Sequence, residues 1–173
     1  MRVALLGGSF DPPHRAHVQV IEHLLQGGRF DEVWVLPSPQ NPLKPDSAPF
    51  EDRLAMCRLA FEGLDPRVRV KDDEGALTGY TIDLIRHLKQ HYPKAEFTFV
   101  GGSDLKDELP RWKEIEALKK ILHFEFLPRP PDPASPFDAI SATEVRGKIK
   151  KGLPADDQVP KSVLAYIKNR GLY

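Results

Sequence analysis

Two histidines lie three residues apart near the start of the chain, at the end of the segment Gly7–His17. This segment begins with two glycines and passes through two prolines before it reaches His14 and His17. Glycines let a backbone approach a ligand closely, and prolines keep a connection extended, so that a helix begins after them. Histidines three apart share one helix face, and the free N–H groups of a helix N-terminus favour an anion. The segment therefore predicts a polyphosphate site.

Two other interpretations of the same segment are weaker. Its glycines and prolines could form an ordinary tight turn with two surface histidines. The spacing of Asp11, His14 and His17 also permits a metal site, but the sequence contains no further evident cluster of ligands, so none is predicted. The pattern Gly-x-x-x-x-Gly-Lys-Ser/Thr is absent from the sequence, so a phosphate loop of that type is excluded.

A second segment with suitable chemistry, Ile140–Arg146, lies near the other end of the chain. Ser141 or Thr143 can cap a following helix and still offer a hydroxyl group to a ligand. Arg146, one turn later, supplies a planar and permanently charged guanidinium that suits phosphate oxygens. Taken alone, the segment is better explained as an ordinary capped helix with a solvated arginine.

Three single residues could also contact a ligand. Trp112 follows a helix-breaking proline outside any strong apolar period, so its ring could stack on a flat ligand or pack in the core. Asp104 follows a strand and two glycines, where a carboxylate can accept hydrogen bonds from a ribose or cap a helix. Lys44, in a proline-rich loop, could reach phosphates or remain solvated.

Short apolar runs alternate with helical patterns along the whole chain. This alternation predicts an α/β fold, a doubly wound and mainly parallel sheet with helices on both faces, in which ligands bind beyond the carboxyl ends of the strands. The expected strands are Val3–Leu6, Val33–Leu36, Val68–Val70, Phe97–Val100 and Ile121–Leu127, and the expected helices are Arg15–Gln26, Phe50–Glu62, Thr81–His91, Glu114–Lys120, Thr143–Lys151 and Pro160–Arg170.

Composition sets the class of the protein. The chain has 173 residues, 40% of them hydrophobic, which suits one domain over residues 1–173 with a substantial core. Its 25 basic and 25 acidic residues cancel, which argues against binding to nucleic acid or to an anionic membrane. No apolar run reaches the ~20 residues that cross a membrane. A single cysteine, Cys57, cannot form an internal disulfide, so we expect a cytoplasmic location.

The two segments together resemble nucleotidyltransferases related to class I aminoacyl-tRNA synthetases. Gly7–His17 is similar to their His-x-Gly-His signature, with Ala16 in place of the glycine. Ile140–Arg146 resembles their Ile-Ser-Ser-Thr-x-x-Arg motif, with Ala142 in place of the middle serine.

Three further stretches resemble bacterial nicotinate-nucleotide adenylyltransferases. They are Gly79–Asp83, Val100–Trp112 and the ending Val159–Ile167. The chain departs from the family pattern at Leu43, where a histidine is usual, and at Leu84, where a second threonine is common.

This resemblance implies a Rossmann-like enzyme that transfers the adenylyl group of ATP, bound with Mg²⁺, to nicotinate mononucleotide. Pantetheine phosphate or nicotinamide mononucleotide as acceptor, or a nucleotide sensor without catalysis, stay as alternatives, and a homo-oligomer is compatible with the sequence. The implied catalytic residues are His14, His17, Lys44 and Arg146; the implied ATP contacts are Gly7, Gly8, Ser9, Phe10, His14, His17, Gly102, Asp104, Ile140, Ser141, Thr143 and Arg146; the implied acceptor contacts are Asp11, Lys44, Tyr80, Thr81 and Trp112.

Overall fold

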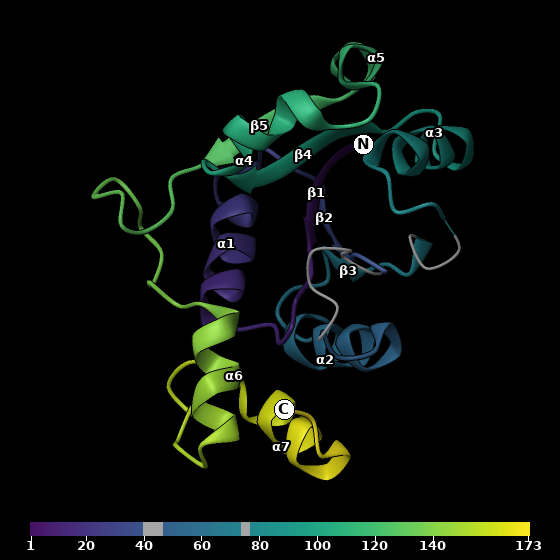
Figure 1. Cartoon of the computed structure of the whole chain (residues 1–173). Helices are drawn as coiled ribbons and strands as arrows, with labels where there is room; N and C mark the ends of the chain where they lie inside the picture. The colour runs from purple at the N-terminus through teal and green to yellow at the C-terminus, as the bar shows by residue number, and fades with distance from the viewer. Residues whose placement is uncertain (40–46, 74–76) are drawn as a thin grey trace.

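A computed structural model describes residues 1–39, 47–73 and 77–173 of the chain (Figure 1). Five strands form one sheet in the order β3-β2-β1-β4-β5, and every pairing is parallel. The predicted parallel sheet is therefore confirmed. The strands are β1 (Arg2–Gly8), β2 (Glu32–Pro37), β3 (Val68–Val70), β4 (Glu96–Gly102) and β5 (His123–Leu127).

Helices connect the strands and close the chain. Gly27, with φ of 74°, follows the first helix and turns the chain towards β2, a conformation that glycine adopts without steric cost. The helices are α1 (Arg15–Leu25), η1 (Gln26–Gly28), α2 (Phe50–Phe61), α3 (Thr81–His91), α4 (Leu105–Glu108), η3 (Leu109–Arg111), α5 (Ile115–Ile121), α6 (Ala142–Lys150) and α7 (Lys161–Arg170).

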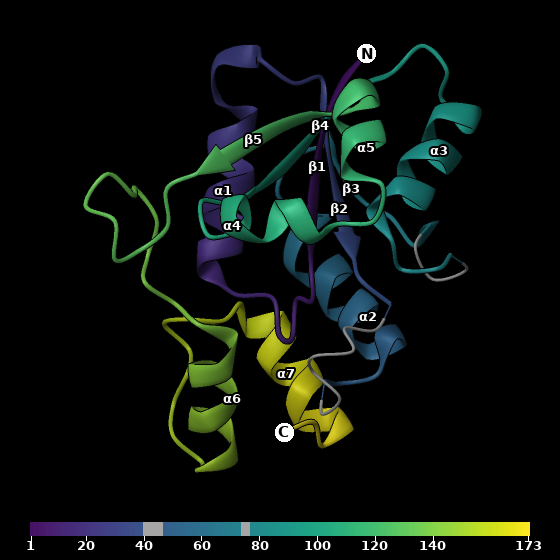
Figure 2. The ribbon, with the colours of Figure 1, turned by 45° about the horizontal axis from the view of Figure 1, so that its top comes forward.

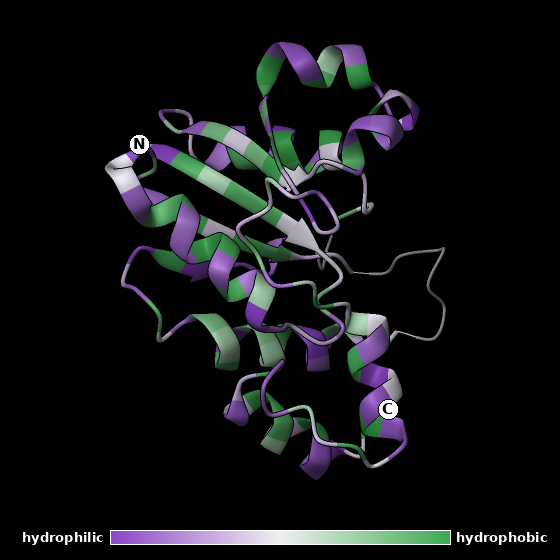
Figure 3. Cartoon of the chain, turned by 90° about the vertical axis from the view of Figure 1, so that its left-hand side faces the viewer, coloured by the Kyte–Doolittle hydropathy of each residue, from purple (hydrophilic) through white to green (hydrophobic). Residues whose placement is uncertain are grey.

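Alternate residues of the strands pack into two separate apolar cores. On β1, Ala4 and Leu6 face a core shared with α1, α2 and α7, whereas Val3 and Leu5 face a core shared with α3 and α5. The strands are mostly green in the hydropathy view, and the helices alternate between green and purple (Figure 3). This arrangement is that of a parallel sheet buried on both faces, as the sequence predicted.

The sheet changes direction of winding between β1 and β4, because β2 and β3 lie on one side of β1 and β4 and β5 on the other. Ligands of such sheets bind beyond the carboxyl ends of the strands at this point. Helices α6 and α7 lie beyond that end of β1 (Figure 2). In the described part of the chain, no helix has both the length and the apolar character needed to cross a membrane.

Most predicted elements are confirmed, with two corrections. Ile121 belongs to α5 instead of the following strand, which begins only at His123. The short helix α4 was not predicted, because four residues are too few to show a helical period. Trp34 and Cys57 are buried in the cores.

Candidate nucleotide and acceptor site

The two histidines lie stacked at the N-terminus of α1. Their ring centroids are 3.7 Å apart, and the backbone N–H of His14 donates to Nδ1 of His17 over 3.1 Å. Because that Nδ1 accepts a hydrogen bond, the Nε2 of a neutral His17 carries the proton and is a donor. His14 is 4% exposed, and its Nδ1 has no hydrogen-bond partner among the described residues.

Burial keeps both imidazoles uncharged at neutral pH. Desolvation, and then the positive charge of Arg129, lowers the pKa of His14 to about 4. The pKa of His17 is also well below its ordinary value, through desolvation, His14 and Arg129 in that order. A bound polyphosphate would raise both values, since an anion favours the charged form.

Phe10 and Arg53 hold the loop before α1 in place. Phe10 has φ of 47°, which is unusual for a residue with a side chain, and its buried ring packs against His17 and Phe61. Arg53, 2% exposed, donates to the carbonyl oxygens of Ser9, Ala48 and Pro39 at 2.7–2.9 Å. This role of Arg53 could not be predicted from the sequence, because nothing local in α2 indicates that its partners are distant carbonyls.

Helix α6 brings the second predicted segment to the first. Nη1 of Arg146 donates to the backbone oxygen of Asp11 at 2.6 Å, and Nη2 lies 3.4 Å from the Thr143 hydroxyl. Before the helix, the backbone N–H of Asp138 donates to Gln19 of α1 at 2.8 Å. Two segments 135 residues apart therefore meet at the N-terminus of α1.

Arg129 lies beside residues of the predicted site, although it was not itself predicted from the sequence. It follows β5 and pairs with Asp104, Nη1 to Oδ2 at 3.1 Å. A Cβ atom on Gly102 would overlap the Arg129 side chain, so glycine at the end of β4 makes room for it. A cavity of about 580 Å³ opens beside this pair, lined by Ser103, Asp104, Asp107, Arg129, Pro130, Pro131 and Asp132. Proline-rich surroundings concealed Arg129 in the sequence, since that stretch has the pattern of an irregular surface loop.

Trp112 is half-buried and belongs partly to the second core. Its ring lies 5.3 Å from that of Phe99, at 90°, and 6.2 Å from that of Phe124. A Cβ on Gly7 would lie 3.2 Å from the same Phe99 ring, so Trp112 is one ring away from the end of β1. Both predicted settings of Trp112, packing and access to a ligand, are compatible with this position.

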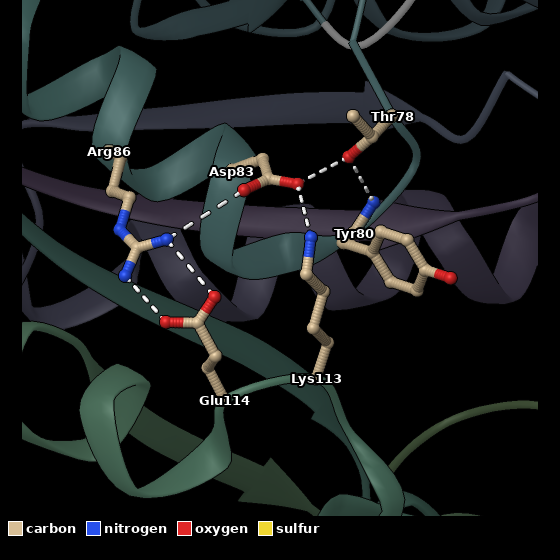
Figure 4. Close-up of polar contacts among 6 residues, drawn as sticks. All are labelled: Thr78, Tyr80, Asp83, Arg86, Lys113 and Glu114. Carbon is tan, nitrogen blue, oxygen red and sulfur yellow. Dashed lines mark hydrogen bonds and ion pairs between the residues drawn. The ribbon is translucent and has the colours of Figure 1, made fainter.

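A polar network joins the Trp112 segment to the start of α3 (Figure 4). Lys113 Nζ lies 3.1 Å from Asp83 and 4.5 Å from the centre of the Tyr80 ring. Arg86 pairs with Glu114 at 2.6 Å. The hydrogen bond from Thr78, followed by that from Lys113, lowers the pKa of Asp83. These contacts hold the first turn of α3, whose free N–H groups suit an anion, beside Trp112.

The structure therefore brings the predicted residues into two neighbouring groups at the carboxyl end of the sheet. His14, His17, Gly102, Asp104 and Arg146 lie around the ends of β1 and β4. Tyr80 and Thr81, at the start of α3, are linked to the Trp112 segment through Lys113. Asp11 is only 3% exposed and accepts hydrogen bonds from Ala48 N–H and the Tyr173 hydroxyl, so its contact with the acceptor stays a prediction. Lys44 and Leu43 lie outside the described residues.

The remaining residues that are predicted to contact ATP would offer it mainly backbone atoms. Gly7 and Gly8 end β1, the carbonyl oxygen of Ser9 is taken by Arg53, and the ring of Phe10 is buried beneath the histidines. Ile140 is half-buried, and Ser141 is the N-cap residue of α6.

Known proteins resemble this chain over almost its whole length. Residues 5–148 match the family model described as cytidylyltransferase-like. A protein of Anaeromyxobacter dehalogenans named "Probable nicotinate-nucleotide adenylyltransferase" is 39% identical over 99% of this chain and 96% of its own length. A protein of Myxococcus xanthus with the same name is 34% identical over 100% and 95%.

Solved structures share the fold. The nicotinic acid mononucleotide adenylyltransferase of Plasmodium falciparum, solved in complex with NaAD, superposes with a TM-score of 0.79 at 23% identity, covering 99% of this chain and 97% of its own. The full-length similarity to the bacterial relatives and the match of the family model show that this chain belongs to the cytidylyltransferase-like family, among the nicotinate-nucleotide adenylyltransferases.

Proposed function

We propose that this protein transfers the adenylyl group of ATP to nicotinate mononucleotide and releases pyrophosphate. One observation carries the proposal: the stacked, uncharged histidines at the N-terminus of α1, with a buried Nδ1 of His14 that lacks a partner among the described residues. A buried nitrogen without a partner is rare and often belongs to a ligand site. The curated relatives carry the name of this activity, and the Plasmodium falciparum structure contains NaAD, the product.

The reaction is an in-line displacement at the α-phosphorus of ATP. An oxygen of the acceptor's 5′-phosphate forms the new bond to that phosphorus, the bond to the bridging oxygen breaks, and its electron pair leaves with pyrophosphate. The attacking phosphate is already anionic at pH 7, so no side chain has to remove a proton. Catalysis is then a matter of position and of charge stabilisation.

Each group of the site has one task in this proposal. The Nε2–H of His17 donates to the departing phosphates, and the guanidinium of Arg146 stabilises their charge from α6. Arg129, beside Asp104, adds a second positive charge over the nucleotide. We propose that Mg²⁺ enters with ATP as part of the substrate, because no cluster of three or more potential ligands is present among the described residues.

The acceptor's pyridine ring lies against Trp112 in this proposal, and its carboxylate meets the first N–H groups of α3. A carboxylate is favoured at a helix N-terminus over a neutral amide, since the amide gains less from the helix dipole. Because of this charge difference, nicotinate mononucleotide is proposed to be a better acceptor than nicotinamide mononucleotide. Lys44, outside the described residues, is proposed to reach the phosphates.

The test is a pyrophosphate-release assay with ATP and three acceptors, nicotinate mononucleotide, nicotinamide mononucleotide and phosphopantetheine. We expect the highest kcat/KM with the first. Faster turnover of phosphopantetheine would assign the protein to a different acceptor class. ATP binding without turnover of any acceptor would support a sensor.

A further inference from the structure

The last residue of the sequence is connected to the first predicted motif. The hydroxyl group of Tyr173 donates a hydrogen bond to Oδ1 of Asp11 at 2.5 Å. The same oxygen accepts the backbone N–H of Ala48 at 3.1 Å. Because the Asp11 carboxylate is 3% exposed, these donors replace water that it would otherwise need.

The chain reverses direction at the end of α7, and Tyr173 therefore points back towards the core. Gly171 has φ of 65°, and the N–H of Leu172 reaches the carbonyl oxygen of Ile167 at 3.1 Å, which reverses the chain after the helix. Leu172 and Tyr173 then pack against the core formed with α1, α2 and α7. Burial, followed by the hydrogen bond to Asp11, raises the pKa of the Tyr173 hydroxyl, so it stays a donor at neutral pH.

Asp11 is also a partner of Arg146. Nη1 of Arg146 lies 2.6 Å from the backbone oxygen of Asp11 and 3.5 Å from its carboxylate Oδ2. The carboxylate is thus held between Tyr173 and Ala48 on one oxygen and Arg146 on the other. Without the Tyr173 hydroxyl, Oδ1 would keep only the Ala48 N–H as a donor, and the buried carboxylate would draw on Arg146 more strongly.

We propose that Tyr173 is a positioning residue for Arg146: by satisfying Oδ1 of Asp11, it keeps the arginine's other N–H groups directed at the polyphosphate. The inference rests on the proposed function, in which Arg146 meets the phosphates. It adds a role for Tyr173 in the geometry of the loop before α1, 162 residues away.

The test compares Tyr173→Phe with Tyr166→Phe. Both changes remove a phenol hydroxyl that donates to an aspartate, since Tyr166 donates to Asp52 at 2.8 Å on the side of α7 that faces α2. We expect Tyr173→Phe to lower kcat on the order of tenfold, the size of one charge-assisted hydrogen bond, with the acceptor KM unchanged. Tyr166→Phe should lower the melting temperature and leave kcat near that of the unmodified protein. Equal kcat losses in the two variants, or none in Tyr173→Phe, would overturn the inference.

A binding measurement separates this inference from the proposed reaction. Calorimetric titration with inorganic pyrophosphate needs no acceptor and no turnover, and it can be made for Tyr173→Phe, Arg146→Lys and the double variant. If Tyr173 acts through Arg146, Tyr173→Phe weakens pyrophosphate binding several-fold when it is made in the unmodified protein. The same change weakens binding much less in a protein that already carries Arg146→Lys. Additive losses would show that Tyr173 does not act through Arg146, whatever the acceptor of the enzyme is.

Discussion

The backbone N–H of His14 donates to Nδ1 of His17, so the second imidazole caps the very helix that it helps to start. This bond fixes which nitrogen of His17 carries the proton when the ring is neutral, and it leaves Nε2 as the donor for a ligand. One side chain therefore serves the helix with one nitrogen and the substrate with the other.

These two tasks of His17 can be separated by substitution. In His17→Asn, the amide oxygen can replace Nδ1 as acceptor, whereas the Nε2 donor is lost. We expect kcat to fall by about 10²–10³, as for other lost donors to developing charge, with little change in melting temperature. Steady-state kinetics and a thermal melt on one preparation measure both. A kcat close to that of the unmodified protein would mean that His17 serves only the helix.

Arg129 is expected to bind the phosphates or ribose of ATP, because it lies beside Asp104 and its charge reaches both histidines. Arg129→Ala should raise the KM for ATP roughly tenfold, as expected for a charge-assisted hydrogen bond, and leave the acceptor KM nearly unchanged. Arg29→Ala is the matched control, since Arg29 pairs at 3.0 Å with Glu125 of β5, the strand that Arg129 follows. An equal change in both variants would indicate a general effect of surface charge.

The ion pairs between α3 and the Trp112 segment should tune acceptor binding. Lys113→Met removes the contacts with Asp83 and the Tyr80 ring, which hold the two walls of the proposed acceptor site together. We expect the acceptor KM to rise about two- to fivefold, because an exposed pair contributes only ~0.2–1 kcal/mol, while the KM for ATP stays constant. Lys119→Met breaks the more exposed pair with Glu116 on α5 and should change neither constant. A shift in the KM for ATP would argue against this division of the site.

Trp112→Ala should raise the acceptor KM several-fold to tenfold through the loss of ring stacking. Since the indole also packs against Phe99, the melting temperature should fall as well. Trp112→Phe keeps an aromatic surface and should restore most of both properties. Loss of stability with unchanged kinetics would assign Trp112 to the core alone.

The buried imidazole of His14 predicts how stability depends on pH. Its pKa is about 4 when folded and near 6.5 when unfolded, so the unfolded chain binds an extra proton between these values. The free energy of unfolding should therefore fall as the pH decreases from about 6.5 towards 4, by roughly 2 kcal/mol from His14.

Urea unfolding at pH 7 and pH 5 measures this dependence. His14→Gln should reduce it, with the remainder due to His17, whose pKa is also lowered, whereas His123→Gln, at an exposed position of β5, should leave it unchanged. A dependence that is the same in both variants would contradict the assignment to His14.

Local sequence patterns determined the elements and the two principal motifs of this protein. Short continuous apolar runs determine strands such as Val33–Leu36, because a strand in a parallel sheet is buried on both faces. His14 is the N-cap of α1 and His17 lies in its first turn, so the geometry of this pair follows from its spacing.

Only the tertiary structure decided the partners that lie far apart in the sequence. Arg53, Arg129 and Tyr173 carry no local signal, because each acts on groups brought to it by the sheet order or by the return of α7. The neutral state of His14 is likewise a result of burial by the assembled fold, since desolvation arises from every element packed around the ring. Spacing selects which side chains can form a site, and packing sets their charge and their hydrogen-bond partners.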